Sequence, residues 1–192
     1  MARHGALIAM EKCLEQVAGK SVAAKVMQGS EQITEKTDKK KIAQYTMGVI
    51  EQLDASVDQE TRMKVMQDCG YNCAEKNHKV IEKAVKRRKK FSNIEDFLNA
   101  EQLNPMKGTR LTREGNIIYQ FYTPQTFTIP MRCYCSLFME LPSEETVSPT
   151  YCNCSKGFVE KYWESVLQKS VKVDLLQSAI SGAKECKFAI YL

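Results

Sequence analysis

The sequence of 192 residues predicts an α+β fold, in which N-terminal helices pack on an antiparallel sheet of about four or five strands with one crossing helix. Apolar residues recur at helical spacing in the first part of the chain. They alternate with polar residues in short segments after Pro105, and one amphipathic helical pattern interrupts these segments. We therefore expect a single domain over 1–192, mainly helical over 1–104, with the sheet and its helix over 105–192.

Four helices are expected before the sheet. The first lies within 5–29, which has a helical apolar stripe and ends at Gly29, and the second runs roughly from Asp38 to Leu53. The members of the first stripe are Leu7, Met10, Leu14, Val17 and Ala18. A short fourth helix, NIEDFLNAEQL, is expected to begin after an N-cap at Ser92 or Asn93.

The third expected helix carries two of the cysteines. It begins at Asp58, whose side chain suits an N-cap, and its pattern extends to about Lys90. Helical spacing places Cys69, Cys73 and Asn77 on the face that we expect to be buried. Gly70 lies between the cysteines and leaves room for another backbone or a ligand to come close.

The second half of the chain reads mainly as strands. A hairpin is expected over 109–124, with its turn at REGN, and a third strand over 126–141, where Pro130 indicates an edge or a bulge. An amphipathic helix over 154–168 follows a polar loop. Two further strands, within 170–182 and 184–192, are expected to meet at a turn containing Gly182.

Eight cysteines are present, and six of them form close pairs. The pairs are Cys69 and Cys73, Cys133 and Cys135, and Cys152 and Cys154. The first pair shares a helix face, the second would share a strand face, and the third precedes a helix whose N–H dipoles favour thiolate. Each pair can therefore present two sulfurs to one point.

Tetrahedral thiolate coordination is what Zn²⁺ prefers, so these six cysteines are candidate ligands of a zinc site. The spacing differs from the CxxC knuckles of zinc ribbons and fingers. Cysteine is also a small apolar residue that is often buried, so core packing is the alternative interpretation. We assign Cys13, which stands alone in an amphipathic helix, and Cys186, which alternates with Phe188, to the core.

Histidine offers little support for catalysis. The sequence holds only His4, near the terminus, and His78, which is rotated off the face of Cys73 and is expected at the surface. No nucleotide-binding glycine motif occurs. If the protein is an enzyme, the nucleophile is expected to be Cys154 or Cys152, activated by the helix N-terminus.

The C-terminal segment 151–192 resembles the end of the 4-vinyl reductase-like domain, a ligand-binding domain of the TRAPP/NO-signalling type. Two cysteines and a glycine-aromatic pair open a helix, and a glycine turn precedes a C-x-F-x-I strand. The matching residues are Cys152, Cys154, Gly157, Phe158, Gly182, Cys186, Phe188 and Ile190. Similar endings occur in sensor domains of aromatic-responsive regulators and in L-2-amino-thiazoline-4-carboxylic acid hydrolases. The whole chain, with its CGYNCA motif, resembles an uncharacterised bacterial family with paired cysteines.

This resemblance implies a sheet covered by helices that holds a small ligand, often with a zinc ion bound by cysteines near the crossing helix. By position, that zinc role falls on Cys152, Cys154 and Cys186. The turn SGAKEC lacks the extra cysteine of some sensor domains, and a cysteine from one of the other two pairs could replace it.

Composition narrows the expected partners. The formal charge is +5, from 28 Lys and Arg against 23 Asp and Glu, and no basic stripe interleaved with aromatic residues is present, so no nucleic-acid partner is expected. No apolar run approaches the ~20 residues of a membrane span, and no signal peptide is recognisable. We expect a cytoplasmic protein with reduced thiols, whose first helix could pack on a second copy in a homodimer.

Three functions follow from these observations. The first is a small-molecule-binding module with a cysteine-rich zinc site. The second is a cysteine-dependent hydrolase acting on a small molecule. The third is a non-catalytic assembly protein whose cysteines only fill the core. The sequence identifies neither the ligand nor the oxidation state of the thiols.

Overall fold

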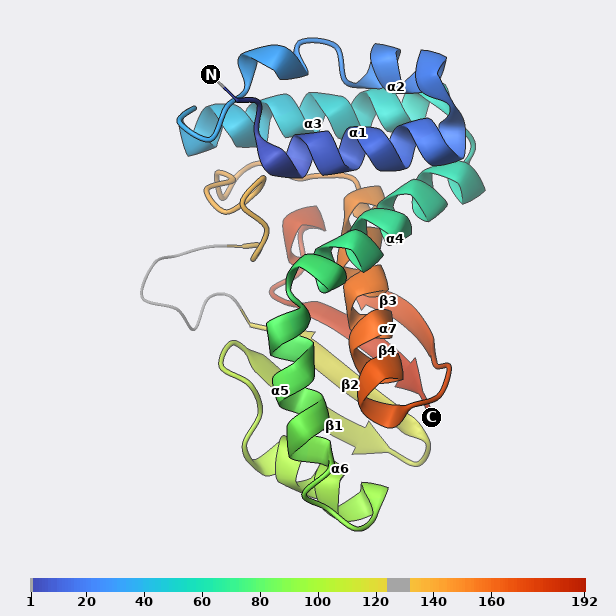
Figure 1. The fold of residues 1–192 in the computed structure, drawn as a ribbon. Coiled ribbons are helices and arrows are strands. Elements are labelled where there is room, and N and C mark those ends of the chain that lie inside the picture. Colours follow the sequence, from blue (N-terminus) through green and yellow to red (C-terminus); the bar gives the residue numbers. More distant parts are fainter. Residues whose placement is uncertain (1, 124–131) are drawn as a thin grey trace.

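A computed structural model describes residues 2–123 and 132–192 of the chain. It confirms the α+β prediction. A layer of helices forms one end of the molecule, and an antiparallel sheet covered by further helices forms the other end (Figure 1). The helices are, in order, α1 (Gly5–Ala18), α2 (Lys20–Val26), η1 (Ser30–Gln32), α3 (Lys39–Ser56), α4 (Gln59–Lys76), α5 (His78–Arg88), α6 (Ile94–Leu103), η3 (Pro149–Cys152), α7 (Asn153–Leu167) and η4 (Ala179–Ser181). The strands are β1 (Thr109–Glu114), β2 (Ile117–Tyr122), β3 (Lys172–Gln177) and β4 (Cys186–Tyr191).

The described strands form one antiparallel sheet in the order β1-β2-β4-β3. The expected hairpin and the expected final pair of strands are both present. β4 inserts between β2 and β3, which places Cys186 opposite Tyr122. In Figure 1, α7 and α5 lie in front of this sheet, and α4 continues from α5 toward the layer of α1, α2 and α3.

Side-chain caps explain where several helices begin. Asp38 accepts hydrogen bonds from the backbone N–H groups of Lys40 and Lys41 at the start of α3. Asp58 caps α4 and Asn93 caps α6, as the sequence predicts. His4 caps α1 through Nδ1, which accepts from the N–H of Ala6 at 3.2 Å.

Two expected helices are each divided in two. Gly19 has a φ of 86° and separates α1 from α2. Asn77 separates α4 from α5, and its side-chain amide donates at 2.8 Å to the carbonyl of Cys73, which also accepts from the backbone N–H of Asn77. The prediction that Asn77 is buried was wrong, since it is exposed at this break, whereas Cys69 and Cys73 are half-buried.

The third expected strand, over 126–141, falls partly on residues 124–131, which lie outside the described residues. Its described part is not a strand. Residues 132–141 form bends and turns, because the N–H of Phe138 donates to the carbonyl of Cys135 and the N–H of Leu141 to that of Phe138. Strand alternation therefore does not orient Cys133 and Cys135.

Two glycines bring α4 and α7 into backbone contact. A Cβ atom built on Gly70 would lie 2.1 Å from the carbonyl oxygen of Cys154, and one on Gly157 would lie 2.3 Å from the carbonyl oxygen of Gln67. The space that the sequence predicts at Gly70 is thus filled by the backbone of α7. This contact sets the two cysteine-bearing helices against each other.

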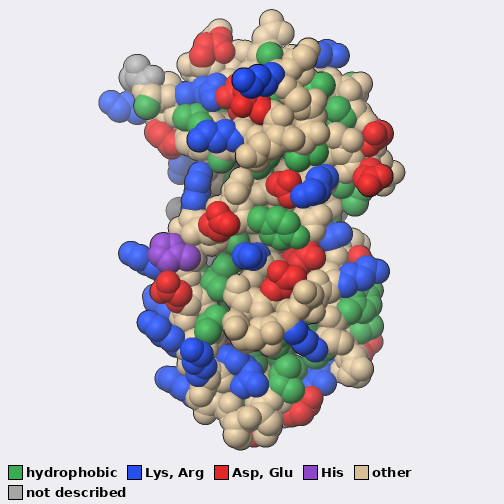
Figure 2. Space-filling view, turned by 45° about the vertical axis from the view of Figure 1, so that its right-hand side comes forward, with side chains coloured by type: hydrophobic (Ala, Val, Ile, Leu, Met, Phe, Trp, Pro, Cys, Tyr) green, Lys and Arg blue, Asp and Glu red, His purple; other side chains and the backbone are tan. Residues whose placement is uncertain are grey.

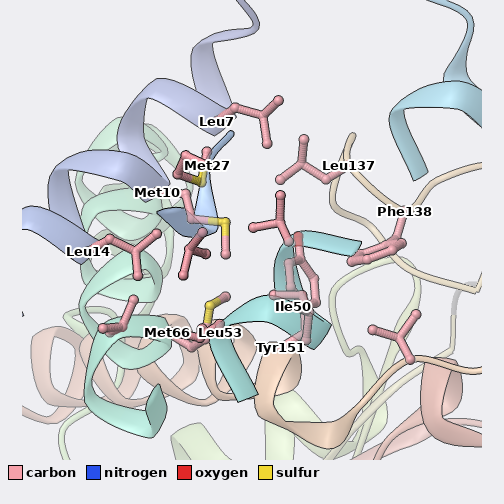
Figure 3. Close-up of a cluster of buried hydrophobic side chains, with 14 of the residues drawn as sticks. Leu7, Met10, Leu14, Met27, Ile50, Leu53, Met66, Leu137, Phe138 and Tyr151 are labelled. Atoms are coloured by element: carbon pink, nitrogen blue, oxygen red, sulfur yellow. The ribbon is translucent and has the colours of Figure 1, made fainter. Parts of the chain in front are cut away.

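The buried residues form two clusters. One contains residues of α1, α2, α3 and α4 together with residues of the segment 137–152. Figure 3 shows Leu137, Phe138 and Tyr151 of this cluster beside side chains from α1, α3 and α4. The other joins α5, α6 and α7 to the sheet. Figure 2 shows Lys, Arg, Asp and Glu side chains distributed over the visible face of the molecule. Within the described residues, no helix combines the length and apolar content that crossing a bilayer requires.

Candidate functional site

An apolar cavity of about 100 Å³ lies where α1 and α4 meet the start of α7. Its lining comes from four parts of the chain. These are Ala6, Ala9 and Met10 of α1, Met66, Cys69, Cys73 and Lys76 of α4, Cys135 and Leu137 of the turn segment, and Tyr151 and Cys154 near the start of α7. In Figure 3, Met10, Met66, Leu137 and Tyr151 point into one region from these different elements. We call this space the sulfur-lined cavity.

Four of the six predicted site cysteines border this cavity. Cys69 and Cys73 reach it from one face of α4, as their spacing predicts, and Cys154 reaches it from the first turn of α7. Cys135 completes the group, and its Sγ accepts a hydrogen bond from the hydroxyl of Tyr151 at 2.9 Å. Residues far apart in the sequence therefore converge, as the paired-cysteine interpretation requires.

The other two predicted cysteines border a smaller neighbouring cavity of about 30 Å³. Cys133 and Cys152 lie there with Cys186, and Cys135 lines both spaces. The Sγ of Cys152 lies 2.9 Å from the hydroxyl oxygen of Ser178. Cys186 is 7% exposed and accepts a hydrogen bond from the N–H of Ala179, so it packs in the core and also touches the cysteine group.

Burial keeps the thiols of the sulfur-lined cavity neutral. It raises the pKa of Cys154 well above the ordinary value, and the neighbouring Cys135 adds to the effect. Burial also raises the pKa of Cys135, against the opposing hydrogen bond from Tyr151. For Cys73, burial and Cys135 raise the pKa, while Asn77 and Lys76 oppose the rise. At neutral pH the thiols of the cavity are therefore uncharged, and the ammonium group of Lys76 is a charged group in its lining.

Two cysteines outside the predicted site take part in this arrangement. Cys13 is completely buried and contacts Cys69, and its Sγ also accepts from the side-chain amide of Asn72 at 3.2 Å. Hydrogen bonding to Cys13 raises the pKa of Cys69, and burial adds to the rise. In the same way, contact with Cys186 and then burial raise the pKa of Cys152.

The donor set does not form a zinc site in this geometry. Across 2–123 and 132–192, no three Cys, His, Asp or Glu side chains converge as a metal ion requires. The six cysteines are instead divided between two neighbouring cavities. Zinc therefore stays a prediction from the sequence.

Among residues 2–123 and 132–192, no base lies in hydrogen-bond contact with the thiol of Cys152 or Cys154, as the activation of a nucleophile requires. The hydrogen-bond partner of the Cys152 thiol is a serine hydroxyl, and the pKa of Cys154 is raised, the opposite of what a helix N-terminus alone would give. His78 is exposed at the start of α5, and His4 is buried as the cap of α1. Neither histidine lines the sulfur-lined cavity.

Sequence reasoning missed several residues of the cavity. Met10 and Met66 bring two thioethers, Tyr151 brings a hydroxyl, and Lys76 brings the one charged group of the lining. Met10 could have been found, because it stands three residues before Cys13 on the same stripe of α1. Lys76 gave no signal, because exposed lysines at helix ends are common.

Known structures share this fold. An H-NOX protein variant from K. algicida, in the unliganded Fe(II) state, matches with a TM-score of 0.53 and 11% identity, covering 98% of this chain and 95% of that one. A variant H-NOX domain from Shewanella oneidensis, in the Fe(II)CO ligation state, matches with a TM-score of 0.52 and 12% identity, covering 100% and 98%. These neighbours support the expected helix-covered sheet, whereas the specific relationship to 4-vinyl reductase-like domains stays a prediction.

The sequence also matches one protein family. No curated protein matches the chain. Residues 7–192 match DUF6144, described as a family of unknown function, and this range contains all eight cysteines and every residue of the sulfur-lined cavity except Ala6. The chain belongs to the family DUF6144.

Proposed function

We propose that this protein is a small-molecule-binding module whose ligand occupies the sulfur-lined cavity. The observation that supports the proposal is an apolar space of about 100 Å³ built from four separate parts of the chain. Ligand sites are typically apolar hollows with a few polar groups.

The lining defines the chemistry of the ligand. Neutral thiols, thioethers and methyl groups favour an apolar molecule, and flexible methionine side chains adapt to its shape. An engineered apolar cavity of roughly 150 Å³ takes up benzene, so the smaller space here suits an apolar group of a few carbon atoms. Tyr151 and Lys76 are the polar groups that could orient it.

Heme is a feature of the H-NOX family, to which these neighbours belong, and the shared fold raises the question of heme for this chain. The sulfur-lined cavity does not fit that group. Its lining offers sulfur and tyrosine groups that can ligate heme iron, but its volume of about 100 Å³ is well below the roughly 300–1,000 Å³ of pockets for drug-sized ligands. A small-molecule ligand other than a porphyrin is therefore the proposal that these residues support.

A titration with a small neutral molecule tests the proposal. In ¹⁵N–¹H spectra, 1-butanol is expected to shift the amide signals of Ala6, Cys69 and Cys154 and to raise the melting temperature, because a ligand stabilises the state that binds it. Ala6→Leu fills the cavity and should abolish these shifts. Ala18→Leu is the matched control, since it lies on α1 outside the cavity lining and should leave them unchanged.

Two results would reject this function. One is the absence of any localised shift with the unmodified protein, and the other is an equal response of the two leucine variants. A native mass spectrum of the purified protein would also report a retained ligand. The same spectrum would test the zinc prediction, since a bound zinc ion adds its mass.

A further inference from the structure

A second hollow adjoins the sulfur-lined cavity on the outside of the molecule. It is an open groove of about 510 Å³ between α1 and α4. Ala9 and Lys76 line both spaces, so they form the boundary between the groove and the cavity. The boundary therefore consists of one short side chain, that of alanine, and one flexible side chain, that of lysine.

The groove carries an excess of positive charge. Lys12 and Lys76 project from its two walls, and Glu75 is the acidic residue of the lining. All three side chains are exposed, and within the described ranges none of them forms an ion pair. The polar amide of Asn72 is already engaged, since it donates to Cys13. Two unpaired ammonium groups therefore flank the way into a neutral cavity.

Lys76 is placed to act on both spaces. Its positive charge opposes the burial that raises the pKa of Cys73, so the ammonium group is electrostatically close to the cavity thiol. The side chain can hold its methylene groups against the apolar wall and keep its charge in the groove. A ligand that spans the boundary would meet sulfur and carbon on one side and an ammonium group on the other.

From this juxtaposition we propose that the ligand of the sulfur-lined cavity is a small carboxylate with a short apolar tail. The tail enters between Ala9 and Lys76 and fills the cavity, while the carboxylate stays in the groove and pairs with Lys76 and Lys12. This inference rests on the proposed function and names its ligand class and access route. It involves no covalent step.

Three probes that share a four-carbon chain but differ in charge test the inference. Butyrate, 1-butanol and butylammonium are titrated into the protein, and binding is followed by ¹⁵N–¹H spectra. We expect butyrate to bind most tightly and butylammonium most weakly. Added salt should weaken butyrate binding and leave 1-butanol binding nearly unchanged, because screening acts on exposed charges.

Substitutions at the groove sharpen the test. Lys76→Met keeps the apolar stem and should weaken butyrate binding by about fivefold, the upper range for an exposed ion pair. Binding of 1-butanol should change much less, because this molecule carries no charge that could pair with Lys76. Glu75→Gln should strengthen butyrate binding. Lys79→Met is the matched control, since Lys79 is an exposed lysine of α5 that lines neither space, and it should have no effect.

The two proposals fail differently. Binding of 1-butanol or butylammonium as tightly as butyrate, or equal effects of Lys76→Met and Lys79→Met, overturns the carboxylate inference and leaves the binding function standing. If none of the three probes shifts the cavity amides, both proposals are overturned.

Discussion

The two ends of α7 lie in contrasting surroundings. At its first turn, Cys154 borders the sulfur-lined cavity of about 100 Å³. About two and a half turns later, Trp163 is 1% exposed, its Nε1 donates to the side chain of Gln120 at 2.7 Å, and the hollow beside it measures about 10 Å³. One helix therefore passes from a hollow region into a tightly filled one.

The difference lies in the side chains that meet at each end. Around Trp163, large side chains such as Tyr162 and Phe188 fill the space between α7 and the sheet. Around Cys154, the lining includes Ala6, Ala9 and several cysteines, whose side chains are shorter than the aromatic ones around Trp163. The cavity is thus a consequence of small residues at a junction that the α4–α7 backbone contact holds in place.

The largest expected effect comes from breaking that contact. Gly70→Ala would force a Cβ atom onto the carbonyl oxygen of Cys154, a backbone atom that cannot rotate away. We expect a loss of about 3 kcal/mol in the free energy of unfolding, at the upper end of overpacking effects. Urea denaturation provides the measurement.

Gly48→Ala is the control for this substitution. Gly48 lies within α3, and a Cβ atom built there meets no atom within 4 Å. Its replacement should be neutral or stabilising by up to about 1 kcal/mol, because alanine favours the helix. Equal stability of the Gly70 and Gly48 variants would show that α4 and α7 are not packed backbone to backbone.

An intermediate effect is expected from alkaline pH. The pKa values of Cys73, Cys135 and Cys154 are raised by burial above the ordinary value of 9.0. Below pH 9 both folded and unfolded chains keep these protons. Above it the unfolded chain releases them first, so stability falls as pH rises from 9 toward the folded-state values.

Tyrosines provide the reference for this pH effect. At the filled end of α7, burial raises the pKa of Tyr162 to about 12, so its contribution is lost only above pH 10, the ordinary value for tyrosine. Urea midpoints at pH 8, 9 and 10 should therefore decline less steeply when Cys73, Cys135 and Cys154 are replaced together by alanine. An unchanged decline would mean that these thiols are not buried.

The smallest expected effect comes from replacing single cysteines, one in the packed core and one beside the cavity. Cys13 and Cys73 each accept a hydrogen bond from an asparagine amide, but Cys13 is fully buried and Cys73 borders the cavity. Cys13→Ala should lower the free energy of unfolding by about 1.5 kcal/mol and Cys73→Ala by less than about 0.5 kcal/mol, because a sulfur beside empty space loses fewer contacts. The reverse order would argue against an open cavity.

The sequence alone determined much of this protein. Helical periodicity located α3, α6 and α7, and alternation located the hairpin and the last two strands, because these patterns follow from local geometry and burial. Spacing within α4 also predicted that Cys69 and Cys73 share a face. The apolar pattern did not predict the breaks at Gly19 and Asn77, where the local backbone conformation divides each of two expected helices into two.

Only the tertiary structure decided which cysteines meet and what surrounds them. The convergence of Cys135 and Cys154 with α4 depends on the close approach at Gly70 and Gly157, and the placement of Lys76 at the cavity wall depends on where α1 crosses α4. Such contacts join residues that are distant in the chain, and no periodicity encodes the distance between two packed backbones. For the same reason, the sequence could suggest a meeting of sulfurs, but it could not show that they surround a space.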